Sequence, residues 1–454
     1  MTTVSAYWQS SKAIVKLFIV GFMMLLLLIP TFMVSHLVEE RRKRQQEATA
    51  EVSSKWGGRQ NIAGPILALP YYATERSNEG KVVQYKKWAF LLPDKLNVQA
   101  KLQPQQRRRG IYKVMLYQSD VRLQGNFGGG QLATLSVDPA QVLWSEARIR
   151  FHVTDLKGLN KVPAVTINNK PYVATTGNYN GQAYLEVPLP AENRDSTGMD
   201  FAATLNLNGT ESFLITPVGR HTAVDITSTW PHPSYTGSIL PQPKTATTDS
   251  TPAHWESFAH NRSFAQQWKD EPYRIGMPTI YQTSVAASTR SSTSVVENND
   301  LGEAAFGLSL FMPVDNYQQT SRAVKYAILC IILTFAAVYL LDVINRKAVH
   351  PVQYALVGLA LVLFYVLLLA VGEYLAFSHA YSIAAMATVG LIAWFMKNVL
   401  ASGKLSLLLA LTLAFVYSYL FTLLRLEDTA LLVGSIGLFV TLAVIMHFSK
   451  KFSW

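Results

Sequence analysis

The sequence predicts a polytopic α-helical membrane protein with six spans, one near the amino terminus and five near the carboxyl terminus, and a large mostly-β extracytoplasmic domain between them. The first observation is residues 352–371, a run of 20 residues without a charge, long enough to cross roughly 30 Å of hydrocarbon as a helix. The second is that four further apolar runs lie around it in the last third of the chain. The third is a strand-like pattern between residues 57 and 322, where most of the charged residues are found.

Residues 14–37 form the first predicted span, which we interpret as an uncleaved signal anchor that follows a short cytoplasmic tail, residues 1–13. The run is too long for the apolar region of a signal peptide, and no A-x-A-like cleavage site follows it. Pro30 should kink this helix. Residues 38–56 have helical composition, with Glu39–Lys43 and Glu40–Arg44 as expected i,i+4 ion pairs of a solvated juxtamembrane helix.

The five carboxyl-terminal spans set the predicted orientation. We place them at residues 325–341, 352–371, 381–396, 405–424 and 430–447, followed by a tail at 448–454. Basic residues alternate between the short connections, and those on one side carry Arg346, Lys347, Lys397, Lys404, Lys450 and Lys451. Because short loops follow the positive-inside rule, this alternation predicts cytoplasmic termini and an outside domain at 57–322. The basic residues of 39–44 argue for the opposite orientation, but long domains translocate regardless of flanking charge.

The predicted outside domain shows several strand and turn signals. Asn208-Gly209 and Asn168-Asn169 each lie between β-prone runs and predict hairpins. Residues 147–155 (ARIRFHVTD) alternate, with Ile149, Phe151 and Val153 on an apolar face and Arg148, Arg150 and His152 on a wet face. Residues 184–190 (YLEVPLP) are typical of an edge strand that ends at prolines. Residues 241–252 form either a long loop or a linker between two sub-lobes, 61–240 and 251–312.

The stretch 230–237 (WPHPSYTG) is the most distinctive part of this domain. Its candidate interaction residues are Trp230, His232, Pro233, Tyr235 and Gly237. A rigid aromatic-proline loop of this kind serves either as a recognition surface or as a structural corner packed by its aromatic rings. We favour the structural corner, because such loops pack more often than they bind.

The sequence contains no motif that indicates an enzyme, a metal site or a cofactor. H-E-x-x-H, C-x-x-C and G-x-S-x-G are all absent, and the one cysteine, Cys330, lies inside an apolar run. Two acids at span ends, Asp342 and Glu373, are candidate functional groups, because ionisable residues within membranes are often functional. Basic residues cluster at 39–44 and 107–109. The first cluster borders a span and indicates lipid headgroups, and no reading element for nucleic acid accompanies either.

Several stretches resemble the CreD family of bacterial inner-membrane proteins, described as cell-envelope-integrity proteins. They are residues 61–71 (NIAGPILALPY), 108–121 (RRGIYKVMLYQSDV), 230–237, 315–329 (DNYQQTSRAVKYAIL), 427–438 (EDTALLVGSIGL) and 350–374, which includes the candidate residues His350, Gln353 and Tyr354. The resemblance runs nearly end to end. It implies a Gram-negative inner-membrane location, a periplasmic domain and a role in envelope stress. It also implies expression tied to a two-component regulator and phenotypes of colicin and cell-wall antibiotic sensitivity, and it supplies no catalytic residues.

Three functions follow as hypotheses. The first is a non-enzymatic envelope-integrity factor whose outer domain contacts envelope components or membrane proteins and whose helices lie in the lipid bilayer. The second is a transporter or flippase component that uses the five-helix bundle with Glu373 and Asp342; the absence of an evident inverted repeat weighs against it. The third is an envelope hydrolase, which predicts activity in the purified fragment 56–312. We rank them in that order.

Overall fold

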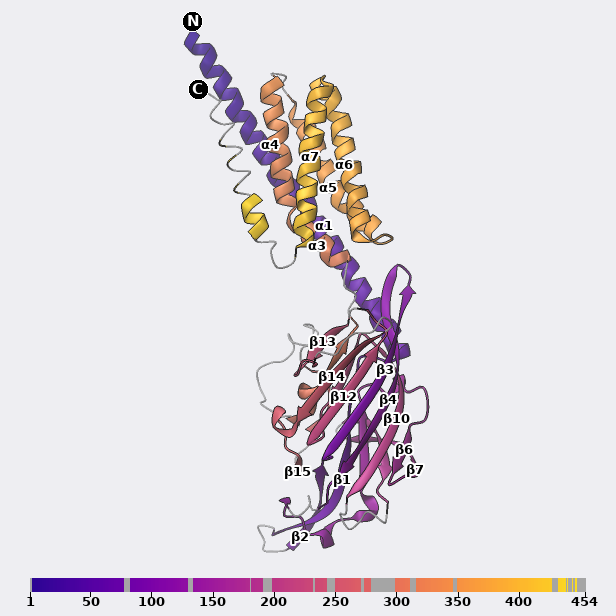
Figure 1. Cartoon of the computed structure of the whole chain (residues 1–454). Coiled ribbons are helices and arrows are strands. Elements are labelled where there is room, and N and C mark those ends of the chain that lie inside the picture. The colour runs from indigo at the N-terminus through magenta and orange to yellow at the C-terminus, as the bar shows by residue number, and fades with distance from the viewer. Residues whose placement is uncertain are drawn as a thin grey trace. The chain divides into compact units, whose positions relative to one another are not determined.

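The computed structural model describes residues 2–76, 82–129, 134–179, 181–190, 198–231, 233–242, 250–270, 273–278, 299–310, 316–345, 349–426, 432–437, 439, 443 and 446. The chain divides into two compact units (Figure 1). A helical unit comprises Met1–Glu47 and Val314–Trp454, and a β unit comprises Ala48–Pro313. The predicted combination of membrane helices with a mostly-β domain is confirmed.

Four described helices are long and apolar enough to cross a membrane. They are α1 (Thr2–Trp56), α5 (Pro351–Gly372), α6 (Phe377–Leu400) and α7 (Gly403–Arg425). A fifth span results if α3 (Asn316–Lys325) and α4 (Ala327–Asn345), which meet at a bend of 47°, count as one. The predicted total of six is not confirmed, because the sixth expected span, 430–447, falls largely outside the described residues.

Helix α1 is a single helix that includes Pro30 and continues through the predicted juxtamembrane segment. Its buried residues in the helical unit recur at heptad spacing: Val20, Leu27, Thr31, Val34 and Val38. Close packing on α5 occurs at Gly358, where a Cβ would overlap the Leu27 side chain. The expected pair Glu40–Arg44 forms at 2.6 Å, whereas Glu39 pairs with Arg42 at 3.8 Å rather than with Lys43.

The β unit contains two large sheets within the described part of the chain. The first has nine strands in the order β13-β18-β11-β1-β5-β9-β8, with β2 pairing β1 and β15 pairing β2. It is formed by β1 (Gln60–Arg76), β2 (Val82–Leu91), β5 (Arg148–Val153), β8 (Thr175–Tyr179), β9 (Gln182–Pro188), β11 (Ser212–Thr216), β13 (Ser234–Gly237), β15 (Gln267–Lys269) and β18 (Phe306–Ser309).

The second sheet has seven strands in the order β14-β12-β3-β4-β10-β6-β7. These are β3 (Lys95–Arg109), β4 (Tyr112–Phe127), β6 (Ala164–Ile167), β7 (Lys170–Val173), β10 (Met199–Thr210), β12 (His221–Ser228) and β14 (Thr251–Phe258). A short pair, β16 (Tyr273–Arg274) with β17 (Asn299–Asp300), is separate. Short 3₁₀ helices lie at Pro139–Gln141, Trp144–Glu146, Leu156–Gly158, Ala259–Asn261 and Leu301–Ala304.

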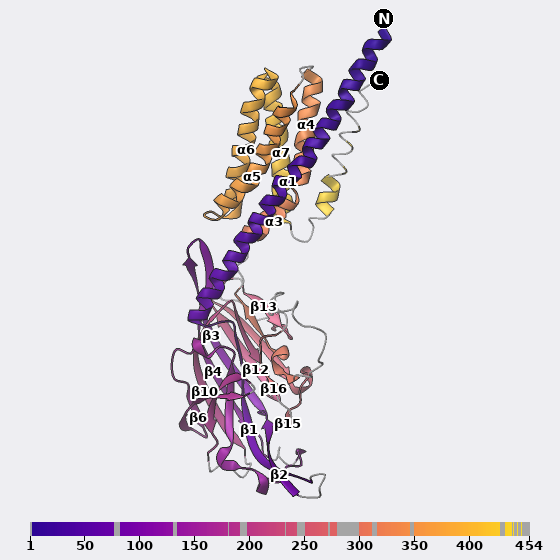
Figure 2. The ribbon, with the colours of Figure 1, turned by 180° about the vertical axis from the view of Figure 1, so that it is seen from behind.

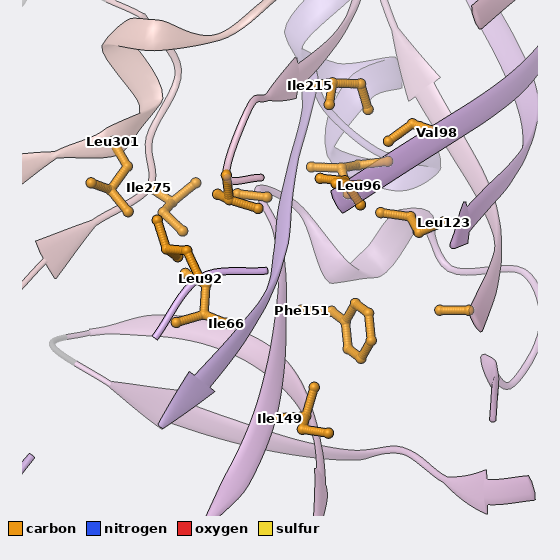
Figure 3. Packing of buried hydrophobic residues seen from close by; sticks show 14 of the residues in the cluster. Ile66, Leu92, Leu96, Val98, Leu123, Ile149, Phe151, Ile215, Ile275 and Leu301 are labelled. Carbon is orange, nitrogen blue, oxygen red and sulfur yellow. The ribbon is translucent and has the colours of Figure 1, made fainter. Parts of the chain in front are cut away.

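The two sheets share one hydrophobic core. Ile149 and Phe151 of the first sheet belong to the same buried cluster as Val98 and Leu123 of the second (Figure 3). Strand β3 alternates exposed and buried residues over its first eight positions, and β12 alternates half-buried and buried residues along its length. This period of two, rather than a continuous apolar run, shows that one face of each strand lies on the core.

Two predicted hairpins have opposite outcomes. The turn at Asn168-Asn169 is confirmed, because both residues have positive φ, 46° and 63°, between the paired strands β6 and β7. The hairpin at Asn208-Gly209 is wrong, because both residues lie within β10 and pair with β4. Gly209 is required there because a Cβ would overlap the Tyr117 ring. The chain turns at Glu211, φ 60°, and passes into the other sheet.

Two expectations about β-strand exposure are also wrong. Arg150 and His152 on the predicted wet face of β5 are each only 3% exposed, because aromatic side chains cover that face as well. Residues 184–190 do not form an edge strand, since β9 pairs with both β5 and β8.

Of the two alternatives for residues 241–252, a linker between two sub-lobes is wrong. Residues 243–249 of the expected linker lie outside the described residues, but β14 after it pairs with β12 before it, over His221–Ser228 and Thr251–Phe258. Strand β18 likewise pairs with β11 in the first sheet. The segment after residue 250 therefore completes both sheets instead of forming a separate lobe.

Candidate functional site

The stretch 230–237 lies at an edge of the first sheet, where Ser234–Gly237 forms β13 and pairs with β18. The Tyr235 ring meets Trp255 edge to face, with centroids 5.9 Å apart. Trp230 packs against the hydrophobic core, and its carbonyl accepts a hydrogen bond from Thr251 at 3.1 Å. Pro233 is half-buried, and His232 lies outside the described residues. These contacts are those of a structural corner.

Gly237 has a specific reason to be glycine. Its φ is 109°, and a Cβ would overlap the carbonyl oxygen of Ala305 and the Cα of Phe306 on the neighbouring strand. This position therefore requires glycine for backbone packing, whatever the surface of the loop binds.

Four of the predicted residues meet at the amino-terminal end of α5. Asp342 is buried and accepts hydrogen bonds from the Val349 N–H at 3.0 Å and the Tyr354 hydroxyl at 3.3 Å. His350 and Gln353 form a capping box, in which Nδ1 of His350 accepts from the Val352 N–H and Oε1 of Gln353 accepts from the His350 N–H. Asp342, His350 and Gln353 each accept a hydrogen bond from a backbone N–H, so the group caps the start of α5 and holds the connection that precedes it.

Glu373 lies apart from that group, at the carboxyl-terminal end of α5. Its carboxylate is 3.6 Å from the guanidinium of Arg41 on α1, and its side chain is only 11% exposed. The side chain of Asn316 on α3 donates to the carbonyls of Gly372 and Leu375. Glu373 therefore belongs to a polar junction of three helices within the helical unit.

The sequence reading missed a hydroxyl and thiol cluster inside the helical unit. Cys330 and Thr334 of α4 lie with Tyr365 of α5 and Tyr417 of α7. The hydroxyls of Thr334, Tyr365 and Tyr417 approach the Cys330 sulfur. Among the described residues, these hydroxyls make no well-formed hydrogen bond. The isolated cysteine was visible in the sequence, but the residues that face it come from three separate helices.

A second missed group surrounds Arg150 and His152 in the β unit. The Arg150 guanidinium lies 4.7 Å from the Trp88 ring centroid and 4.6 Å from that of Tyr184, with Glu186 at 4.0 Å. The His152 Nε2 is 2.9 Å from the Tyr273 hydroxyl. Burial, reinforced by the charge of Arg150, lowers the pKa of His152 to about 3. The histidine is therefore neutral at physiological pH and acts as a buried structural group.

The last turns of α1, which belong to the β unit, make several polar contacts with its strands. Ser53 Oγ donates to Thr210 Oγ1 at 3.0 Å, and Trp56 Nε1 donates to the Tyr117 carbonyl at 3.4 Å. Immediately afterwards Gly57, with φ 131°, brings the backbone so close to Asn208 that a Cβ would lie 2.7 Å from its carbonyl oxygen. We refer to residues 53–59 with these partners as the helix–sheet junction.

The junction continues into β1 without a flexible segment. The Gly58 N–H donates to Asp155 Oδ2 at 3.0 Å, and the Arg59 guanidinium pairs with Glu211 at 2.7 Å. The side chain of Gln60 donates to the carbonyls of Asp155 and Asn208, both at 3.0 Å. Every residue from 56 to 60 is therefore hydrogen-bonded or packed, which fixes the end of α1 on the β unit.

Among the described residues, no three His, Cys, Asp or Glu side chains are grouped so that they could hold a metal ion. The described candidate residues instead cap helices, pack rings or pair charges.

The chain contains apolar helices of spanning length and a two-sheet β unit that is fixed to the end of one of them. These features define an integral membrane protein with a large domain outside the bilayer core. A family model described as "Inner membrane protein CreD" matches residues 12–454. The chain is also 30% identical over 439 residues to "Inner membrane protein CreD" of Escherichia coli (strain K12), covering 95% of this chain and 91% of that protein. The chain belongs to the CreD family.

Proposed function

We propose that this protein is a non-enzymatic inner-membrane factor that supports cell-envelope integrity and the response to envelope stress through a periplasmic β unit. The helix–sheet junction is the observation that carries the proposal. Because the last turn of α1 is hydrogen-bonded to strands of the β unit and the same helix carries an apolar span, we infer that a load on that unit reaches a membrane helix. Family membership and the inner-membrane description of the Escherichia coli relative support the location. The partners we propose are the lipid bilayer and envelope or membrane proteins, and not nucleic acid.

We call this transfer of load from the β unit through α1 to the other helices the relay. The polar junction at Glu373 is where α1 would pass the load on within the helical unit. It ties α1, through Arg41, to α5 and α3 within the helical unit. The buried residues of α1 at heptad spacing add apolar contact to α5, where Leu27 lies against Gly358. A tilt or displacement of α1 therefore changes the packing of the bundle directly.

Uncoupling the junction should abolish function without removing either unit. We expect that six Gly/Ser residues inserted between Trp56 and Gly57 prevent complementation of a deletion strain under envelope stress, as a deletion of residues 56–312 does. The same insertion at Gly181, an exposed turn with open space around it, is the matched control and should complement. Both variants are compared at equal abundance. Full complementation by the Trp56/Gly57 insertion would contradict the relay.

Cysteine labelling tests the proposed topology, with both termini cytoplasmic. In a Cys330→Ser background, Lys157→Cys, at an exposed position of the β unit, should react with an impermeant maleimide in spheroplasts. Lys397→Cys, exposed at the end of α6, should react only after lysis. The reverse pattern of labelling would place the β unit in the cytoplasm.

The transporter alternative makes a different prediction for Glu373. Since Arg41 is partly exposed and a glutamine amide oxygen can still accept from its guanidinium, we expect Glu373→Gln to complement fully. A proton- or ion-coupled transporter that depends on Glu373 would instead lose activity at normal abundance. Complementation assays with parallel immunoblots distinguish the two cases.

A further inference from the structure

The β3–β4 hairpin extends beyond the hydrophobic core at its turn. All residues from Gln106 to Gly110 are exposed. By contrast, the first eight residues of β3 are alternately exposed and buried. Figure 1 and Figure 2 both show this hairpin beside the carboxyl-terminal end of α1, with its turn beyond the rest of the sheet. We refer to residues 107–113 (RRRGIYK) as the basic tip.

Two of the cations in the basic tip face α1 and are engaged there. Arg109 makes a two-pronged contact with Glu51, at 2.9 and 3.2 Å. The Lys55 and Arg109 cations lower the pKa of the Glu51 carboxyl. Arg107 lies 5.3 Å from the Trp56 ring centroid. These contacts hold the hairpin in a defined position along the helix.

The other face of the tip carries a repulsive pair. Arg108 and Lys113 are direct cross-strand partners, and both are exposed. Like charges placed directly opposite each other destabilise a hairpin. Among the described residues neither side chain makes an ion pair with a carboxylate. An anion bound between them would convert this repulsion into two charge-assisted hydrogen bonds.

The contacts with α1 also give the tip a direction. Arg107 lies at Trp56 and Arg109 at Glu51, so the hairpin runs along the last turns of α1 from Trp56 toward Glu51. Glu51 follows the basic residues 41–44 of the same helix by seven positions, about two helical turns. Ile111 and Tyr112 at the turn are half-buried, and an aromatic ring with a polar end suits a membrane interface.

We propose that the basic tip binds the phosphate groups of anionic phospholipids at the bilayer surface, with Arg108 and Lys113 as the binding pair. The chemistry is that of a phosphate oxygen accepting from a guanidinium and an ammonium. The bound lipid neutralises the cross-strand repulsion and holds the β unit close to the membrane. This contact is independent of the proposed envelope function, since it requires only an anionic leaflet.

The experiment uses the full-length protein in nanodiscs. An environment-sensitive fluorophore is attached at Ile111→Cys in a Cys330→Ser background, and quenching by headgroup-labelled lipid is measured. Discs of phosphatidylcholine alone are compared with discs that contain about one-quarter phosphatidylglycerol, which supplies the negative surface potential. A fluorophore at Asp200→Cys, which pairs with Asn126 at the far end of β4, gives the background.

We expect several-fold more quenching at Ile111 in the anionic discs and no difference at Asp200. Arg108→Glu with Lys113→Glu should remove the increase, because each basic side chain near an anionic surface strengthens association by a factor of roughly five. Lys95→Glu with Arg122→Glu is the matched control, since both residues are exposed on the same strands away from the tip. Unchanged melting temperatures show that both variants fold.

Three outcomes would overturn the proposal. Equal quenching in neutral and anionic discs would remove the requirement for lipid charge. Quenching that survives the Arg108/Lys113 reversal would exclude this pair. Inorganic phosphate that shifts the Ile111 signal in neutral discs, and competes away the anionic-disc effect, would identify a site for free anions instead of lipid. Loss of the effect with rising salt would support the proposal, because exposed charges are screened over about 10 Å at 0.1 M salt.

Discussion

Replacing Gly237 by alanine should destabilise the β unit by about 2–5 kcal/mol. A left-handed backbone costs an alanine roughly 1–2 kcal/mol, and a forced overlap in a packed site adds roughly 1–3 kcal/mol. Here the overlapping atoms are the Ala305 carbonyl oxygen and the Phe306 Cα, which cannot move aside as a flexible side chain can. Phe306 also stacks on Trp255 at 5.7 Å, so a displaced strand disturbs the core.

The measurement is the melting temperature of the full-length protein in detergent, followed by tryptophan fluorescence. A loss of this size lowers the melting temperature of a domain of this length by roughly 5–15 °C. Gly110→Ala is the matched control, because Gly110 also has positive φ, 60°, but has open space around its Cβ position. A Gly237 variant no less stable than the Gly110 variant would show that β13 does not pack as described, and would restore the recognition reading of 230–237.

Lowering the pH below 6.5 should destabilise the β unit at pH values that are still too high to protonate its carboxylates. His152 has a folded-state pKa of about 3, whereas its unfolded value is about 6.5. Between these values the unfolded chain binds one more proton, so the free energy of unfolding falls as the pH falls below 6.5. The loss is about 1.4 kcal/mol per pH unit, and reaches roughly 3 kcal/mol at pH 4.5.

The groups that face His152 make it the expected source of this effect. The Tyr273 hydroxyl and the Tyr184 ring are neutral in this range, and Arg150 remains cationic and opposes a second charge. His152→Gln should flatten the pH dependence of chemical denaturation between pH 5 and 6.5, even if it lowers stability at pH 7. His260→Gln, at an exposed position, should leave the slope unchanged. A wild-type stability that is constant over this window would mean that His152 is not buried in the folded protein.

The sequence by itself determined the class of protein, because both signals are local. An uncharged run of 20 residues specifies a spanning helix whatever surrounds it, and α5 begins and ends within one residue of the predicted 352–371. The turn at Asn168-Asn169 was predictable for a similar reason, since positive φ at two successive residues is a requirement of the backbone alone. Family membership also followed from contiguous motifs.

Only the tertiary structure decided the role of each candidate residue. Asn208-Gly209 is a strong turn signal, but both residues pair with β4 inside β10, and residue 209 is glycine because the Tyr117 ring of β4 occupies the space of a side chain. Arg150 was predicted to be wet, and Trp88 and Tyr184, distant in sequence, cover it. The thiol and hydroxyl cluster needs three helices, and the helix–sheet junction needs β4, β10 and the segment at Asp155. Such contacts join residues separated by tens to hundreds of positions, and a pattern of local periodicity carries no information about which of them meet.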